Sequence, residues 1–202
     1  MRKLYLLRHG QSEWNLLGKV QGQSDIELTE KGVKQAHKVA QVFLDKKIDA
    51  IYSSDLKRAC QTAEIIGNKL DLKVNTLCGI REMNFGQWQG LPIETIEKNH
   101  TEHYRLWRTA PHEATFIDGE NLASVQKRAL DCVNKIMFET SEKNILLVSH
   151  GTAIKALILG LLDIDLSKYN KMDIGNTGIT IIEFRDFSAV LTLLNDTDHL
   201  RD

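Results

Sequence analysis

Apolar residues recur along this chain in two patterns, one typical of helices and one typical of strands. Four segments repeat apolar residues every three or four positions, and we predict amphipathic helices that begin after Thr29, near Asp55, near Asn121 and at Gly151. Short apolar runs predict strands over residues 3–7, 49–52, 72–75 and 144–149, and a hairpin of 178–184 with 189–194. Several of these runs have no polar interruption, which is typical of strands covered on both faces. The pattern therefore predicts an α/β fold with a mostly parallel sheet between helices.

The stretch from residue 91 to residue 118 departs from this alternation. Its periodicity is weak, and it collects polar and aromatic side chains, namely His100, His103, Tyr104, Arg105, Trp107 and Arg108. Such a composition is typical of a surface excursion, so we predict an insertion or lid over the sheet at 91–118. No linker rich in Pro, Gly or Ser divides the 202 residues, and we predict a single domain over residues 1–202.

Charge and composition narrow the classes of partner. The chain has 26 Lys and Arg residues against 27 Asp and Glu, a formal net charge of −1. It therefore has no broad positive field for nucleic acid or an anionic membrane. Its longest apolar stretch, residues 156–162, is far shorter than the ~20 residues of a membrane span, and residues 4–7 are too few for a signal-peptide core. We expect a cytoplasmic protein with neither a nucleic acid nor a membrane as partner.

Residues that can bind an anion follow three of the predicted strands. Arg8 and His9 follow the first apolar run, Arg58 lies in the first turn of the helix after the second, and His150 follows the run at 144–149. Ligands of an open α/β sheet bind beyond the carboxyl ends of its strands, so these side chains should meet at one rim. A glycine after each histidine permits close approach of the backbone, and nearby helix N-termini add positive potential. We therefore predict a phosphate pocket.

The sequence around these residues contains a series of longer motifs. They are LRHGQSEWN at 7–15, QG at 21–22, LTEKG at 28–32, SSDLKRACQTA at 53–63, REMNFGQWQG at 81–90, GEN at 119–121 and VSHG at 148–151. In this order, across nearly the whole domain, they resemble the histidine phosphatase superfamily, also called phosphoglycerate mutase-like. The members that look most similar are short bacterial phosphatases of the α-ribazole phosphatase and phosphoserine phosphatase types.

The resemblance implies a three-layer sandwich and a phosphomonoesterase that acts on a small phosphorylated metabolite without metal or cofactor. His9 would be the nucleophile, forming a phosphohistidine, and Glu82 would be the acid/base. The residues that would hold or border the phosphate are Arg8, Asn15, Gln21, Gly22, Arg58, His150 and Gly151. The resemblance also implies a homodimer, whereas the sequence itself leaves the oligomeric state open.

Energetics explain why such a site would concentrate charge. Hydrolysis of a phosphomonoester can demand an acceleration of about 10²¹, or roughly 28 kcal/mol, of which general acid catalysis supplies roughly 3–5 kcal/mol. Preorganised charge must supply much of the rest, and we expect Arg8, Arg58 and a cationic His150 to provide it. A histidine nucleophile must be neutral, and the two arginines disfavour the imidazolium of His9. A backbone carbonyl that accepts from its other ring nitrogen would fix the tautomer.

Other phosphatase chemistries fit the sequence less well. A cysteine phosphatase needs an arginine six positions after its cysteine, but Ile66, Asn84 and Phe138 occupy these positions. The 3 cysteines are odd in number and lack C-x-x-C spacing, which predicts buried, reduced thiols. The run HTEH at 100–103 lacks the H-E-x-x-H pattern of a zinc site.

Two other functions stay open. A phosphoglycerate mutase would use the same phosphohistidine and return the phosphoryl group to the product, although such mutases are usually longer than 202 residues. A phosphate-sensing module without catalysis is the second alternative, and the complete catalytic set argues against it. The substrate stays open among α-ribazole phosphate, phosphoserine, phosphoglycerate and sugar phosphates. We expect 91–118 to determine it, with Arg105 and Arg108 as candidates to contact its non-phosphate end.

Overall fold

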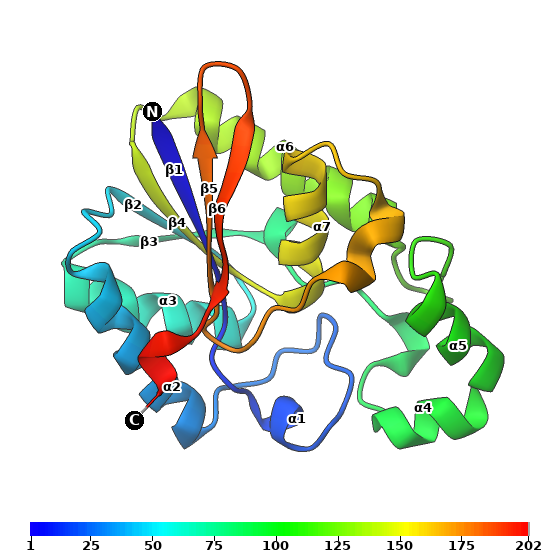
Figure 1. Ribbon diagram of the computed structural model, residues 1–202. Helices are drawn as coiled ribbons and strands as arrows, with labels where there is room; N and C mark the ends of the chain where they lie inside the picture. Colours follow the sequence, from blue (N-terminus) through cyan, green and yellow to red (C-terminus); the bar gives the residue numbers. More distant parts are fainter. Residues whose placement is uncertain (202) are drawn as a thin grey trace.

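The computed structural model describes residues 1–201, which contain a mixed six-stranded sheet (Figure 1). The strands are β1 (Arg2–Arg8), β2 (Ala50–Ser54), β3 (Val74–Leu77), β4 (Asn144–Ser149), β5 (Ile179–Phe184) and β6 (Ala189–Asp196), in the order β3-β2-β4-β1-β5-β6. Strands β1 to β4 pair in parallel, and β5 and β6 add an antiparallel hairpin beside β1. The predicted α/β class and mostly parallel sheet are confirmed. The last residue of the predicted domain, Asp202, lies outside the described residues.

The helices begin close to the predicted positions. They are α1 (Glu13–Leu16), α2 (Glu30–Phe43), α3 (Lys57–Leu70), α4 (Ile93–Asn99), α5 (Thr101–Thr109), α6 (Leu122–Glu139) and α7 (Gly151–Leu161), with 3₁₀ turns η1 (Cys78–Ile80), η2 (Gly86–Trp88), η3 (Leu166–Lys171) and η4 (Asp198–Leu200). Thr29 and Asn121 act as N-caps of α2 and α6, where each side chain accepts a hydrogen bond from a backbone N–H of the first turn. Within residues 1–201 no helix has the length and apolar character to cross a membrane.

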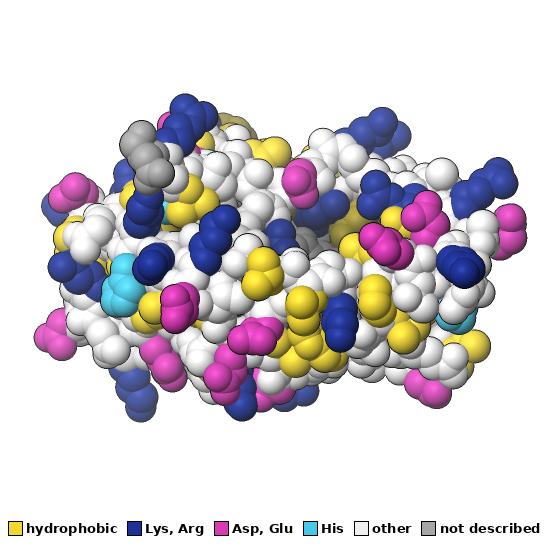
Figure 2. Space-filling view, turned by 90° about the horizontal axis from the view of Figure 1, so that it is seen from below, with side chains coloured by type: hydrophobic (Ala, Val, Ile, Leu, Met, Phe, Trp, Pro, Cys, Tyr) yellow, Lys and Arg dark blue, Asp and Glu magenta, His cyan; other side chains and the backbone are white. Residues whose placement is uncertain are grey.

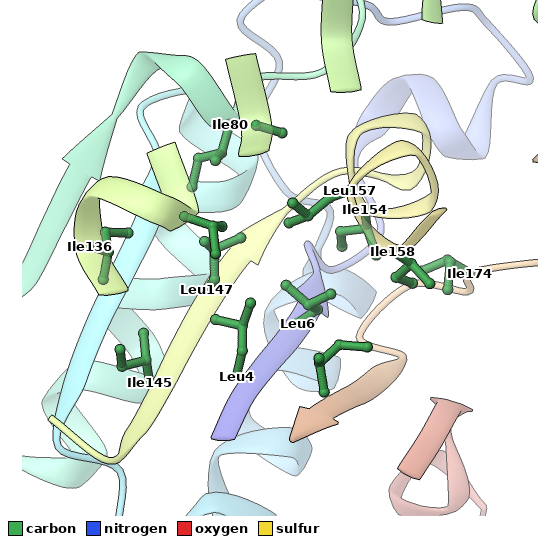
Figure 3. Packing of buried hydrophobic residues seen from close by; sticks show 13 residues of the cluster. Leu4, Leu6, Ile80, Ile136, Ile145, Leu147, Ile154, Leu157, Ile158 and Ile174 are labelled. Atoms are coloured by element: carbon green, nitrogen blue, oxygen red, sulfur yellow. The ribbon is translucent and has the colours of Figure 1, made fainter. Parts of the chain in front are cut away.

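Side chains of β1 alternate between two hydrophobic cores. Leu4 and Leu6 pack with residues of α6 and α7, as Figure 3 shows. Tyr5 and Leu7 pack with residues of α2 and α3 on the other face of the sheet. Because successive side chains of a strand point to opposite faces, one uninterrupted apolar run supplies both cores. The sheet is therefore the middle layer of the predicted three-layer sandwich.

The third strand begins two residues later than the sequence predicts. Asp71 adopts a left-handed conformation with φ of 56°, and the N–H of Leu72 donates to the carbonyl of Gly67 at 2.9 Å. These two residues complete the C-terminal turn of α3, which delays the start of β3 to Val74.

The segment 91–118 contains two helices that the periodicity did not predict. Helix α4 buries only Ile96, and α5 has no buried residue, so neither has the long apolar stripe that a sequence pattern reveals. Aromatic contacts hold the segment instead, since the Trp107 ring centroid lies 5.6 Å from that of Phe116 and 5.6 Å from that of Tyr169 in η3. Figure 1 shows α4 and α5 beside the main body of the sheet.

The cysteines follow the prediction only in part. All three are free thiols, as predicted from their spacing. Cys60 and Cys132 are half-buried, and burial raises the pKa of both thiols. Cys78 is exposed, so the prediction of a buried thiol is wrong at this position, because the η1 turn lies at the surface of the sheet edge.

Candidate active site

The four side chains predicted to converge meet at the carboxyl edge of the sheet. Arg8 ends β1 and His9 follows it, His150 follows β4, and Arg58 lies in the first turn of α3 after β2. Because β1 and β2 both pair in parallel with β4, the three strands end at the same edge. The ring centroids of His9 and His150 lie 5.2 Å apart. Figure 2 looks onto this edge and shows it hollowed, with Lys and Arg side chains around the hollow.

His9 is held as a neutral imidazole whose Nε2 carries no proton. Its Nδ1 donates to the carbonyl of Gly10 at 2.7 Å, and Nε of Arg58 donates to its Nε2 at 3.3 Å. Burial lowers the pKa of His9 well below 6.5, and the charges of Arg58 and Arg8 lower it further. Nε2 is therefore unprotonated at neutral pH. The Gly10 carbonyl is the backbone acceptor that the sequence argument required for this tautomer.

Arg58 is fixed by backbone carbonyls and keeps its charge available. The side chain is 1% exposed, and its terminal nitrogens donate to the carbonyls of Gly22 at 2.7 Å and Ser24 at 2.8 Å. Gly22 has φ of +53°, a conformation that favours glycine, and it aims this carbonyl at the guanidinium. Burial lowers the pKa of Arg58 to about 10, which still leaves it charged at neutral pH. The loop that contains Gly22 thus lies directly against the Arg58 guanidinium.

Two buried nitrogens in this pocket have no hydrogen-bond partner. They are Nε of Arg8 and Nδ1 of His150. Arg8 is anchored by its terminal nitrogen, which donates to the carbonyl of Ile174 at 2.6 Å, so its Nε stays free to serve a ligand. An unsatisfied buried polar group destabilises a fold by about 1–3 kcal/mol, and such groups concentrate at functional sites. An anion bound here would supply acceptors for both.

The surroundings of His150 oppose its expected cationic state. Burial lowers the pKa of His150 well below 6.5, and the charge of Arg58 lowers it further. Its Nε2 lies 2.8 Å from Oγ of Ser54. When the Ser54 hydroxyl donates to Nε2, the proton of the neutral ring sits on Nδ1 and can be donated to a ligand. His150 therefore contributes a hydrogen bond, and the positive charge comes from Arg8 and Arg58.

The carboxylate of Glu82 is positioned by the first turn of α7. Its Oε2 accepts from the N–H of Thr152 at 3.1 Å, and its Oε1 accepts from the N–H groups of Ala153 at 3.1 Å and Met83 at 2.8 Å. The positive end of α7 was predicted to face the phosphate, but these amides bind Glu82 instead. Glu82 is thereby fixed beside Gly151, which follows His150.

Asn15 joins the same edge through its neighbours. Its Oδ1 accepts from the N–H of Ser12 at 3.2 Å and from Nδ2 of Asn176 at 3.3 Å. The Ser12 hydroxyl in turn donates to Oε1 of Gln21 at 2.7 Å. With its oxygen engaged, Asn15 can offer its amide N–H groups to a phosphate. Asn176, which also donates to the carbonyl of His9 at 3.0 Å, was missed by sequence reasoning because no motif marks it.

The glycines after the two histidines differ in the space that a Cβ atom would have. A Cβ at Gly10 would lie 2.5 Å from the carbonyl oxygen of Gly32, so the backbone there needs glycine. The three atoms nearest to a Cβ at Gly151 would belong to Arg8, with Nε 3.7 Å away, which is ordinary van der Waals contact. These contacts do not by themselves require glycine at this position.

Comparison with known proteins agrees with this geometry. A family model described as the histidine phosphatase superfamily (branch 1) matches residues 4–197. The chain belongs to this superfamily. Phosphoserine phosphatase 1 of Hydrogenobacter thermophilus is 36% identical over 200 residues, which are 99% of this chain and 95% of that protein. The crystal structure of a phosphoserine phosphatase from Entamoeba histolytica in complex with 3-phosphoglyceric acid has a TM-score of 0.88 and 41% identity and covers 100% of both chains.

A third relative bears on the reaction type. A probable phosphoglycerate mutase of Yersinia pestis is 31% identical over 205 residues, which are 99% of this chain and 95% of that protein. The relatives named as phosphatases show that this histidine phosphatase is a phosphomonoester hydrolase. The mutase stays as the alternative reaction of the same fold.

A network behind Glu82 of the phosphatase was not predicted in detail. Arg128 of α6 donates to the backbone carbonyl of Glu82 at 2.9 Å and to both carboxylate oxygens of Glu120 at 2.7 and 3.0 Å. Gln23 donates to the same Glu82 carbonyl at 3.1 Å. Glu120 belongs to the GEN motif, whereas its partner Arg128 lies in the predicted helix and belongs to no motif. The network fixes the backbone from which Glu82 projects.

We expect the Arg128→Met variant to unfold more easily and to misplace Glu82. Losing one partner of a largely buried ion pair leaves Glu120 uncompensated, which should lower the free energy of unfolding by about 2–4 kcal/mol. Urea denaturation measures this. Lys127→Met is the matched control, because Lys127 is exposed and its pair with Asp131 at the surface contributes about 0–1 kcal/mol. Equal losses in the two variants would contradict the assigned role of Arg128.

The two buried histidines should make the phosphatase less stable in acid. The folded state depresses the pKa of His9 and of His150 well below 6.5, so both groups take up protons on unfolding. Their contribution to stability is complete above the unfolded pKa near 6.5 and is lost as pH falls. The free energy of unfolding should fall by up to about 2.7 kcal/mol per pH unit below this value, or about 1.4 kcal/mol per proton.

Urea titrations between about pH 5 and pH 7 in phosphate-free buffer measure this slope. The His9→Gln variant should lose about half of it, since one of two protons is removed. His37→Gln is the control, because His37 is exposed on α2 and should leave the slope as it is. A slope that is the same in wild type and in His9→Gln would show that the folded state does not lower the pKa of His9.

The remaining candidates of segment 91–118 are two histidines and two arginines. The rings of His100 and His103 pack on Trp88, with centroids 6.2 and 4.8 Å apart from it. In residues 1–201 no group of three His, Cys, Asp or Glu side chains is arranged to hold a metal ion. Arg105 and Arg108 are exposed on α5.

Proposed function

We propose that the protein hydrolyses phosphomonoesters by two phosphoryl transfers, first to Nε2 of His9 and then to water. The observation that carries this proposal is the pair of buried N–H groups without partners, Nε of Arg8 and Nδ1 of His150, beside the lone pair of His9. A phosphoryl group satisfies both donors and brings its phosphorus next to the nucleophile. No other buried set in residues 1–201 combines these features.

In the first transfer, the Nε2 lone pair attacks phosphorus and the bond from phosphorus to the ester oxygen breaks. The leaving alkoxide takes a proton from Glu82, whose carboxyl group is fixed by the α7 amides and takes up that proton when the phosphate dianion binds beside it. The guanidinium groups of Arg8 and Arg58 face the equatorial oxygens and stabilise their charge. A charge pair at about 4 Å and an effective dielectric near 20 interacts by about 4 kcal/mol, so two arginines contribute a large share of the catalysis.

In the second transfer, water attacks the phosphohistidine and the bond between phosphorus and Nε2 breaks. Glu82, now ionised, takes the proton from this water and returns to its starting state. The electron pair returns to Nε2, and His9 is neutral again because Nδ1 still donates to Gly10. Phosphate then leaves the Arg8 and His150 donors.

The relatives favour hydrolysis of a small phosphorylated acid but keep a mutase in view. Two of the similar proteins are named phosphoserine phosphatases and one is a probable phosphoglycerate mutase. The length of 202 residues was expected to disfavour a mutase, but that relative matches along 95% of its own length, so length does not separate the reactions. α-Ribazole phosphate and sugar phosphates are the other substrate classes to be compared.

The proposal includes a lid at residues 91–118 and a cytoplasmic location. Trp107 of this segment packs on Tyr169, whose hydroxyl donates to Oγ1 of Thr152 at 3.1 Å, next to the amide that binds Glu82. This contact supports a role of the segment in covering the leaving-group side. Free thiols in Cys60, Cys78 and Cys132 support a reducing compartment.

Phosphate release with and without a bisphosphate primer tests the proposed reaction. We expect inorganic phosphate from p-nitrophenyl phosphate, phosphoserine and 3-phosphoglycerate without a primer. Isomerisation of 3-phosphoglycerate that requires 2,3-bisphosphoglycerate, with little release of phosphate, would establish the mutase instead. Binding of phosphate without any turnover would establish the sensing module.

A further inference from the structure

One lysine near the acid/base lies unpaired against an aromatic ring. Lys155 is half-buried on α7, and its Nζ lies 3.7 Å from the ring centroid of Tyr169. Among residues 1–201 no carboxylate oxygen lies within 4.0 Å of this nitrogen. An ammonium over an aromatic face is stabilised, but its N–H groups still need acceptors. Lys155 therefore carries unused donor capacity.

A short chain of contacts joins this lysine to the acid/base. The Tyr169 hydroxyl donates to Oγ1 of Thr152 at 3.1 Å, and the N–H of Thr152 donates to Oε2 of Glu82 at 3.1 Å. The charges of Asp173 and Glu82 both lie close enough to Lys155 to favour its ammonium, against the opposing effect of burial on its pKa. Its ammonium thus lies on the same side of the pocket as the group that protonates the leaving oxygen.

Helix α5 and turn η3 complete a wall around Lys155. The Trp107 ring packs against Tyr169, and the backbone carbonyl of Arg108 accepts from Nδ2 of Asn170 at 2.8 Å. The charge of Arg108 reaches Lys155, so this exposed residue of α5 adds a second positive charge near the wall. The lining is aromatic and cationic, and Figure 2 shows Lys and Arg side chains around the hollow on this face.

We propose that Lys155 binds a carboxylate of the substrate, so that the enzyme selects small phosphorylated hydroxy acids. This inference rests on the proposed function, because it places the carbon skeleton of the leaving group beyond Glu82. A carboxylate two or three bonds from the ester oxygen supplies the acceptor that Lys155 lacks, and Arg108 adds attraction from α5. A charged hydrogen bond is roughly twice as strong as a neutral one, so a hydroxyl in place of the carboxylate binds less well.

Two substrates that differ in one group test this role. 3-Phosphoglycerate carries a carboxylate where glycerol 3-phosphate carries a hydroxymethyl group. We expect the wild type to prefer 3-phosphoglycerate in kcat/KM, and the Lys155→Met variant to lose about 10- to 100-fold of this preference, mainly through KM. Methionine keeps the apolar stem and the contact with Tyr169 and removes the charge.

Lys168→Met is the matched control. Lys168 is exposed on η3 next to Tyr169. The substitution removes the same charge as Lys155→Met, so the Lys168→Met enzyme should keep the substrate preference of the wild type. If Lys155→Met loses activity equally on both substrates, the residue is structural and the inference is wrong. If the wild type hydrolyses both esters without preference, the inference also fails while the proposed function stands. Absence of phosphate release from either ester and from p-nitrophenyl phosphate is the separate failure of the proposed function.

The pH profile gives a second readout that a structural role would not move. Burial lowers the pKa of Lys155 to about 8, opposed by the attraction of Asp173 and Glu82 and reinforced by the charges of Arg108 and Arg8. The ammonium is lost as pH rises through this value, so the preference of the wild type should decline above about pH 8. In Lys155→Met the ratio of kcat/KM values should be flat over the same range. A wild-type ratio that is equally flat contradicts the inference.

Discussion

We expect the His9→Gln variant to lose at least about 10⁴-fold in kcat/KM and to form no acid-labile phosphoenzyme. Glutamine keeps a polar side chain that can accept from Arg58, so the loss reports the missing imidazole rather than a collapsed pocket. Nε2 is the atom without a proton, since Nδ1 donates to Gly10 at 2.7 Å. Radiolabelled substrate, rapid quenching and acid or base treatment of the protein measure the intermediate.

Phosphate binding separates this chemical defect from a binding defect. Arg8, Arg58 and His150 remain in the His9→Gln variant, so calorimetry should give a dissociation constant for inorganic phosphate within about tenfold of the wild type. His37→Gln, on the exposed side of α2, should turn over normally. A His9→Gln enzyme with a tenth or more of the wild-type activity would falsify the covalent route.

The convergence of the pocket was predictable because it depends on strand topology alone. The uninterrupted apolar runs before Arg8 and His150 predict buried parallel strands, and such strands end at the same edge. The structure pairs Arg8 with Ser149, so the two histidines that follow lie in register. The predicted strand, short loop and helix start are enough to place Arg58 at the same edge. The local sequence pattern therefore predicts the position of Arg8, Arg58 and His150 in the fold.

The protonation of the pocket could not be predicted in full from the sequence. The two arginines indicated a neutral His9, but the same reasoning gave a cationic His150. Burial, which the sequence does not show, is the larger influence on both rings, and it lowers both pKa values. The Ser54 hydroxyl that accommodates a neutral His150 comes from β2 and has no motif of its own.

The leaving-group side was the least predictable part. Lys155 lies between the apolar residues of α7, and the sequence pattern alone predicts that such a single lysine is exposed at the surface. It becomes part of the pocket wall because η3, more than ten residues later, folds back and places Tyr169 on it. Helix α5 escaped prediction for a related reason, since its Trp107 packs on Tyr169 of η3, which is distant in sequence.

We expect the Glu82→Gln variant to distinguish substrates by their leaving groups. For 3-phosphoglycerate, whose alkoxide needs a proton, kcat/KM should fall by about 10²- to 10⁴-fold, or roughly 3–5 kcal/mol. For p-nitrophenyl phosphate, whose phenolate leaves without one, the loss should be less than about tenfold. Glu102→Gln, an exposed position on α5, is the control and should leave both values as they are.

The comparison has to be made in kcat/KM, because Glu82 also serves the second transfer. kcat/KM reports the steps up to formation of the phosphohistidine, whereas kcat includes the attack of water, in which Glu82 is the base for every substrate. Arg128→Met should reproduce the same dependence on the leaving group in weaker form, since it removes one of the two hydrogen bonds to the backbone carbonyl of Glu82 but keeps the carboxyl group. An equal loss on both esters in Glu82→Gln would remove this residue from the role of acid and leave the source of the proton to be found elsewhere on the pocket wall.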